Sequence, residues 1–111
     1  MVGHHPHIPQ PIDVYRGAPI LYSLGNFAFG SYSKKVWEGL LAVAEFGERG
    51  RCVLLEVYPI LVNNHEVNFS PRPISGLEGQ HIFEALTAGI DRTEAEVAWD
   101  GERGLIIPKK E

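Results

Sequence analysis

The sequence predicts a β-dominated α+β fold built from antiparallel hairpins, with one helix late in the chain. β-branched and aromatic residues gather in short runs between turns that carry glycine or asparagine. Only one segment, near residue 80, places apolar residues at helical spacing. The chain has 111 residues, of which 44% are hydrophobic, so we expect a single unit over 1–111 without a second core.

The first predicted hairpin pairs Ile12–Tyr15 with residues 20–23, because both runs are β-rich and residues 16–19 contain a glycine between them. The following residues, 24–31, place glycines on either side of Asn26 and an aromatic pair. That composition suits either a functional loop or an ordinary turn.

The second predicted hairpin joins the two longest apolar segments, residues 40–46 and 52–62, through a turn at residues 47–50. Pro59 cannot donate to a strand ladder, so we expect an edge or a break there. Cys52 is the single cysteine and cannot form an internal disulfide. We therefore interpret it as a small strand residue.

Asn63 and Asn64 form a favourable turn dipeptide, because asparagine tolerates a positive φ. We therefore expect residues 65–69 to fold back as a third strand on the preceding one. His65 would then be an ordinary polar residue of that strand.

Ser75 and the glutamate three residues later match a capping box ahead of an apolar helical face, which predicts a helix over residues 76–88. Gly89 would end the helix as a left-handed cap. Residues 95–99 and 105–107 surround a glycine-bearing turn and predict a final short hairpin.

Three of the five histidines lie within the first nine residues. Pro6 favours an extended conformation in the residue before it, so His5 and His7 should project to one side as a His-x-His metal-binding pair. His4 would point the other way. Two histidines cannot complete a metal coordination shell, so further ligands must come from elsewhere. A solvated histidine-rich turn and the remnant of an affinity tag are the alternatives.

The net charge of −4 and the lack of a basic stripe argue against nucleic acid as the main partner. A nucleic-acid-binding barrel is also disfavoured because Trp37 and Trp99 lie far apart in the sequence. The apolar runs are too short for a membrane span. No signal peptide is expected before the histidines, and the sequence alone leaves the cellular location open.

The block GHHPHIPQPI over residues 3–12 is followed by PILYSLGNF over residues 19–27. Together these motifs resemble the poly-gamma-glutamate capsule synthesis (CapA) family of calcineurin-like metallophosphatases. The likeness is dense over about residues 2–29 and is only one of general pattern from Ser31 onward.

By this resemblance, His5 and His7 fall on the terminal His-x-His motif of the family, a metal-binding motif. His4 falls on a variable position that borders the site. Asn26 falls within the SLGNF block beside the site, so we expect it to support the metal ligands rather than to bind metal. A plain turn asparagine is the alternative.

The resemblance also implies a β-sandwich flanked by helices, with this chain as its C-terminal portion. The cofactor would be a pair of divalent ions, Mn, Fe or Zn. The family carries further ligands, an aspartate and later Glu, Asn and His residues, upstream of this segment. We therefore expect the partner to be the missing N-terminal half of the domain, and we expect the chain to be inactive alone.

The resemblance identifies no catalytic residue in this segment, and it implies a location in the bacterial cell envelope or the cytoplasm. Edge strands left unpaired by a missing half would favour a homodimer. The alternative function is a non-catalytic, β-rich binding module with adventitious metal-binding histidines. Such a module would bind zinc weakly and without a preferred geometry.

Overall fold

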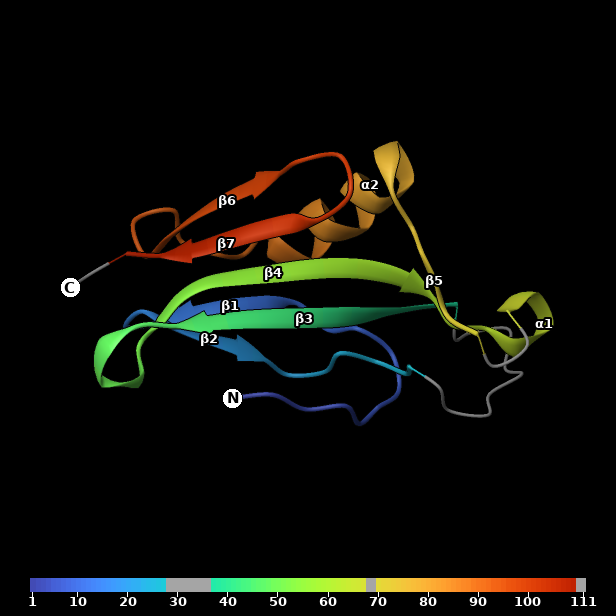
Figure 1. Ribbon diagram of the computed structural model, residues 1–111, viewed down its shortest axis with the longest axis horizontal. Coiled ribbons are helices and arrows are strands. Elements are labelled where there is room, and N and C mark those ends of the chain that lie inside the picture. The colour runs from blue at the N-terminus through green and yellow to red at the C-terminus, as the bar shows by residue number, and fades with distance from the viewer. Residues whose placement is uncertain (28–36, 68–69, 110–111) are drawn as a thin grey trace.

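The computed structural model describes residues 1–27, 37–67 and 70–109 and shows the predicted β-dominated α+β fold (Figure 1). The elements are β1 (Ile12–Tyr15), β2 (Ala18–Leu21), β3 (Glu38–Phe46), the short 3-10 helix η1 (Glu48–Gly50), β4 (Cys52–Leu61), α1 (Asn64–Val67), β5 (Arg72–Pro73), α2 (Gly76–Thr87), β6 (Ala95–Trp99) and β7 (Gly104–Pro108).

The β1–β2 hairpin turns more tightly than the sequence suggests. Arg16 and Gly17 alone connect the strands, with φ values of 49° and 77°. Positive φ at both central residues is the requirement of a type I′ turn, whose twist matches that of a hairpin. Ala18 and Pro19 therefore belong to β2, and the second strand begins two residues earlier than expected.

The main sheet has the strand order β3-β4-β7-β6, and β5 pairs with β4 (Figure 1). The second and last predicted hairpins are both confirmed, as β3–β4 and β6–β7. Pro59 does not break β4. Along one side of β4, the pairing with β7 extends as far as Val57, and the pairing with β5 starts at Ile60. The residue without an N–H thus lies between two partner strands.

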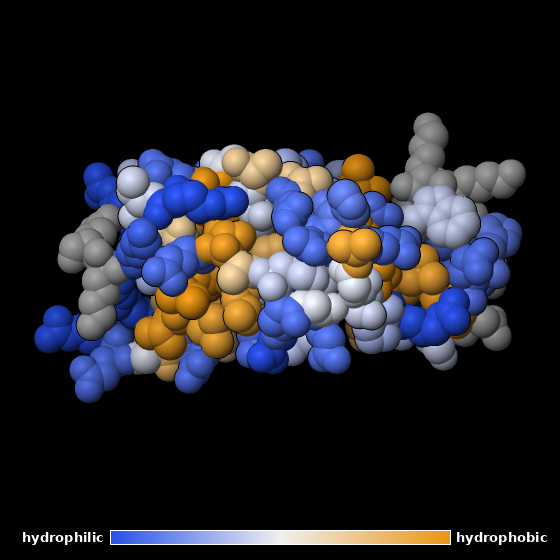
Figure 2. All heavy atoms as spheres, turned by 90° about the horizontal axis from the view of Figure 1, so that it is seen from above, coloured by the Kyte–Doolittle hydropathy of each residue, from blue (hydrophilic) through white to orange (hydrophobic). Residues whose placement is uncertain are grey.

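The core lies on one face of the sheet. Leu55 of β4 is opposite Ile106 of β7, and both side chains belong to one buried cluster. The same cluster includes Ile12 of β1 and Phe83 of α2, so the β1–β2 hairpin and α2 cover the same face. Viewed from the β6 side, the surface is mostly polar, with an apolar patch toward the end where β7 finishes (Figure 2).

Among the described residues, Phe83 is the largest fully buried side chain, and its ring packs 5.9 Å, centroid to centroid, from that of Trp99. A Cβ added at Gly104 would overlap the Phe83 ring. The glycine at the start of β7 therefore lets α2 approach the sheet closely. Trp99 is partly buried and packs against this core.

The predicted strand over residues 65–69 is wrong where the structure describes it. Asn64–Val67 form the short helix α1, and residues 68 and 69 lie outside the described residues. The buried side chain of Asn63 explains the difference. Its Oδ1 accepts a hydrogen bond from the His65 N–H at 3.0 Å, while its backbone carbonyl accepts one from the Val67 N–H at 3.0 Å. The asparagine therefore begins a helical turn instead of a hairpin.

Helix α2 is confirmed over Gly76–Thr87 with Ser75 as its N-cap residue, but neither of the predicted capping interactions forms. Ser75 makes no capping hydrogen bond with its side chain, and Gly89 does not adopt a left-handed conformation. Instead, Arg92 Nη1 donates to the carbonyl oxygens of Thr87 and Ile90, both at 3.1 Å. A cationic side chain thus satisfies the carbonyl of the last helical residue and that of a residue just beyond the helix.

Cys52 begins β4, as expected for a small strand residue, and burial raises the pKa of its thiol. In the part of the chain that the structure describes, no helix is both long and apolar enough to cross a membrane.

Candidate metal-binding site

The histidine-rich segment is a tight turn rather than the expected extended strand. The His7 N–H donates to the His4 carbonyl at 2.8 Å, and His7 has a φ of 75°. The flanking residues explain the turn, since Val2 bridges Leu21 in parallel and Pro9 bridges Leu24 antiparallel. The chain must therefore reverse direction between them.

The turn nevertheless brings His5 and His7 together. Their ring centroids lie 5.5 Å apart, with an angle of 74° between the ring planes. His5 is exposed and His7 is half-buried. The predicted pairing of these imidazoles is therefore present, although a turn and not an extended backbone produces it.

Asn26, in the loop that follows β2, contacts His7. Its side chain is only 5% exposed, and Oδ1 lies 2.9 Å from His7 Nδ1. A carboxamide oxygen can only accept, so His7 Nδ1 carries the proton and donates. In the neutral ring, Nε2 then keeps its lone pair. This arrangement is typical of metal-binding histidines, whose second nitrogen donates to an oriented oxygen.

His4 holds the histidine turn against the loop of residues 23–26. Its Nδ1 lies 3.2 Å from the Gly25 carbonyl oxygen, so the ring is occupied by a contact that His5 and His7 do not share. The buried Ser23 hydroxyl donates to the His4 carbonyl at 3.0 Å and accepts from the Gly25 N–H at 3.1 Å. Sequence reasoning missed Ser23, although it lies in the block that suggested Asn26.

Two glycines allow the loop to lie close to its neighbours. Gly25 has a φ of +74°, and a Cβ there would lie 3.0 Å from Pro9. A Cβ on Gly39 of β3 would collide with the backbone carbonyl of Asn26. Beside them, the Leu40 N–H donates to the Leu24 carbonyl at 2.7 Å. The sheet therefore fixes the backbone from which Asn26 reaches His7.

One polar atom of the site is unsatisfied. Asn26 Nδ2 is buried and has no hydrogen-bond partner among the described residues. Burying an amide donor in this state costs about 1–3 kcal/mol. The carboxamide thus orients His7 with its oxygen, while its nitrogen can still donate to a further group.

The donor set fits part of a divalent-metal site. Imidazole nitrogens suit Zn and Fe, and Asn26 fixes the ring orientation of His7. Within residues 1–27, 37–67 and 70–109, no three His, Cys, Asp or Glu side chains gather to hold one ion. His65 and His81, on α1 and α2, do not join the pair. Among the described residues, His5 and His7 are therefore a pair of neighbouring imidazoles and not a complete set of metal ligands.

Comparison with known proteins relates this site to a family. Residues 1–31 match the family described as bacterial capsule synthesis protein PGA_cap, a stretch that holds the whole His4–Asn26 site. The chain is 35% identical over 106 residues to the PGA biosynthesis protein CapA of Bacillus subtilis (strain 168). The matched residues make up 96% of this chain and 26% of that protein.

A second relative is the capsule biosynthesis protein CapA of Bacillus anthracis. It is 34% identical over 88 residues, which cover 78% of this chain and 20% of that protein. The chain thus spans about a quarter or less of the length of these curated relatives. The likeness continues from the histidine site into the sheet and α2, and the chain belongs to the CapA family of bacterial capsule synthesis proteins.

Proposed function

We propose that this chain is the C-terminal segment of a CapA-type, metallophosphatase-like protein of capsule or poly-gamma-glutamate biosynthesis. In this role it contributes the terminal His-x-His metal motif. The observation that carries the proposal is the hydrogen bond between His7 Nδ1 and Asn26 Oδ1, with the His5 ring beside it. The names of both relatives refer to capsule or PGA biosynthesis.

His5 and His7 would hold divalent ions, Mn, Fe or Zn, as a dinuclear pair in the complete protein. Such a pair would act as a Lewis acid toward a phosphate ester and lower the pKa of a coordinated water. The residues of this chain have a positioning task. Asn26 holds His7 in the tautomer whose Nε2 can bind metal, and His4 with Ser23 holds the turn against residues 23–26.

The remaining ligands would come from the part of a CapA protein that this chain does not contain. Two imidazoles leave at least two positions of a tetrahedral ion to be filled. The unsatisfied Nδ2 of Asn26 would also find its partner when that part closes the site. We therefore propose that the segment is inactive alone and that the missing N-terminal half is its partner.

A chimera tests this function. In Bacillus subtilis CapA, the 106 matched residues are replaced by this chain, and hydrolysis of a phosphodiester such as bis(p-nitrophenyl) phosphate is measured with added Mn²⁺. We expect hydrolysis by the chimera, its loss in His7→Ala, and none by the isolated chain. Hydrolysis by the isolated chain that disappears in His5→Ala would show that the segment needs no partner.

The second candidate function is a non-catalytic binding module with adventitious metal-binding histidines. The exposure of His5 favours it, since an exposed imidazole without oriented partners can bind metal from solution. The same chimera separates the two candidates. If the chain is a binding module, the chimera should fold but should not hydrolyse the substrate. Wild type and Asn26→Ala should then bind zinc with the same weak affinity.

A homodimer through the exposed edge of β6 stays a prediction. Strand β6 ends the sheet order and pairs only with β7 among the described strands. Unpaired edges favour strand addition. A monomeric mass by light scattering would exclude it.

A further inference from the structure

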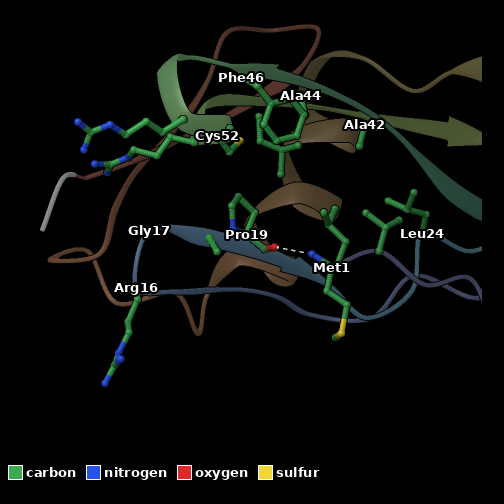
Figure 3. Close-up of a pocket in the computed structure, with 16 residues that line it drawn as sticks. Met1, Arg16, Gly17, Pro19, Leu24, Ala42, Ala44, Phe46 and Cys52 are labelled. Atoms are coloured by element: carbon green, nitrogen blue, oxygen red, sulfur yellow. Dashed lines mark hydrogen bonds between the residues drawn. The ribbon is translucent and has the colours of Figure 1, made fainter.

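An apolar cleft separates the β1–β2 hairpin from the end of the β3–β4 pair. Its volume is about 440 Å³. In Figure 3, Met1, Pro19 and Leu24 form one wall, and Ala42, Ala44, Phe46 and Cys52 form the wall opposite. The small side chains of the two alanines leave the space between the walls unfilled.

The rim of the cleft carries large apolar side chains in water. Met1 is 71% exposed, Val2 57% and Phe46 65%. Single exposed apolar residues are ordinary, but a group of them around an apolar hollow marks an interaction surface.

Among the described residues, the backbone at the cleft has an edge to which no further strand pairs. The Gly3 N–H donates to the Leu21 carbonyl at 2.7 Å, and the Leu21 N–H donates to the Met1 carbonyl at 2.8 Å. These bonds face β2, so the N–H and C=O of Val2 between them face away from β2. An extended segment could add to this edge by backbone hydrogen bonds.

The outer end of the cleft is cationic. Arg16 comes from the β1–β2 turn, and Arg49 and Arg51 come from the β3–β4 turn. Arg51 donates to the Lys109 carbonyl at 3.3 Å, and Arg16 lies 5.3 Å from the centre of the Tyr15 ring. In the described part of the chain both recorded ion pairs belong to Arg103, so these three arginines have no carboxylate partner. A group of unpaired guanidiniums favours an acidic partner.

We propose that this cleft is the docking surface for the part of a CapA protein that this chain does not contain. The docked segment would be extended, with an apolar face in the cleft and acidic side chains at its arginine end. The relatives are long enough to supply it, since the chain accounts for only 26% of the Bacillus subtilis protein. This inference rests on the proposed function, because both assume that the rest of a CapA protein completes this chain.

A binding experiment tests the docking directly. The unmatched part of Bacillus subtilis CapA is produced as a separate polypeptide and mixed with this chain in EDTA, so that metal does not contribute. We expect a one-to-one complex by light scattering, with hydrogen-exchange protection at Val2, Ala44 and Phe46.

Matched variants locate the surface. Phe46→Ser and Ala44→Glu should weaken the complex at least about tenfold, because one removes a large apolar contact and the other places a carboxylate in an apolar cleft that the partner would cover. Leu77→Glu is the control, because Leu77 is 75% exposed on α2 and does not line the cleft. Phe46 is itself largely exposed, so its replacement leaves the fold intact, and circular dichroism verifies this for each variant.

Several results would overturn the proposal. These are a complex that Phe46→Ser and Leu77→Glu weaken equally, protection confined to another face, or no complex at all. A dimer of this chain alone that Phe46→Ser abolishes would assign the cleft to a second copy instead. His7→Ala should leave docking in EDTA unchanged, so failure of docking and failure of the metal site are distinguishable.

Discussion

Asn26 and His7 lie 19 residues apart in the sequence, and the carboxamide oxygen of one accepts a 2.9 Å hydrogen bond from Nδ1 of the other. The contact depends on two reversals of the chain, the His4–His7 turn and the β1–β2 hairpin. It converts a flexible, half-exposed imidazole into one with a defined tautomer.

Asn26→Ala should release the tautomer of His7. With its acceptor removed, the His7 ring should shift from the Nδ1–H form toward the Nε2–H form that free imidazole prefers. Long-range ¹⁵N–¹H NMR spectra at pH 8 report the proton position directly. His81, exposed on α2, is the internal control and should not change. An unchanged His7 spectrum in Asn26→Ala would show that Asn26 does not set the tautomer.

Gly39→Ala should destabilise the fold by about 1–3 kcal/mol, the usual cost of an overpacked site. The new methyl group would collide with the Asn26 carbonyl, so the loop that carries Asn26 would have to move. Urea denaturation measures the loss. Gly89→Ala is the control, because no atom lies within 4 Å of a Cβ added there. Equal stabilities of the two variants would contradict the close packing of this loop on β3.

Phe83→Ala should lower the free energy of unfolding by about 3–5 kcal/mol, because it removes the buried ring that packs against Gly104 and Trp99 and leaves a cavity there. In the same denaturation experiment, Leu77→Ala should be nearly neutral, since Leu77 is 75% exposed on the same helix. A small loss in Phe83→Ala would mean that α2 does not depend on this packing for its position.

Acid should weaken the β6–β7 turn. Hydrogen bonds from the backbone N–H groups of Glu102 and Arg103, followed by the Arg103 side chain, lower the pKa of Asp100. A pKa lowered by folding adds stability that is fully present above the unfolded value of about 3.9 and is lost as pH falls through the folded value. Asp100→Asn should therefore have a lower denaturation midpoint than wild type at pH 6, and this difference should become smaller as the pH is lowered toward 2. A difference that persists unchanged at pH 2 would contradict this.

The strand pattern could be predicted from the sequence because alternating apolar runs and turn dipeptides act locally. This is true of the β3–β4 and β6–β7 hairpins and of α2. The errors arose where a side chain competes with the backbone. Asn63 caps α1 with its own oxygen, and Arg92 replaces the expected glycine cap of α2. Propensity does not specify which of these hydrogen bonds forms.

In the site, the residue types were predicted and the geometry was not. His5 and His7 are paired, but the extended backbone expected from Pro6 gives way to a turn, because both flanking segments pair with residues 21–24. Ser23 and the occupied ring of His4 arise from contacts across about 20 residues, which no local pattern encodes.

We propose that His5 and His7 belong to a dinuclear metal site completed by the rest of a CapA protein. The most direct test is the metal content of the Bacillus subtilis chimera, measured by mass spectrometry after dialysis, for wild type, His5→Ala with His7→Ala, and the control His81→Ala. We predict two divalent ions per chain in wild type and in His81→Ala, and fewer in the double variant. An unchanged metal content in the double variant would contradict the claim.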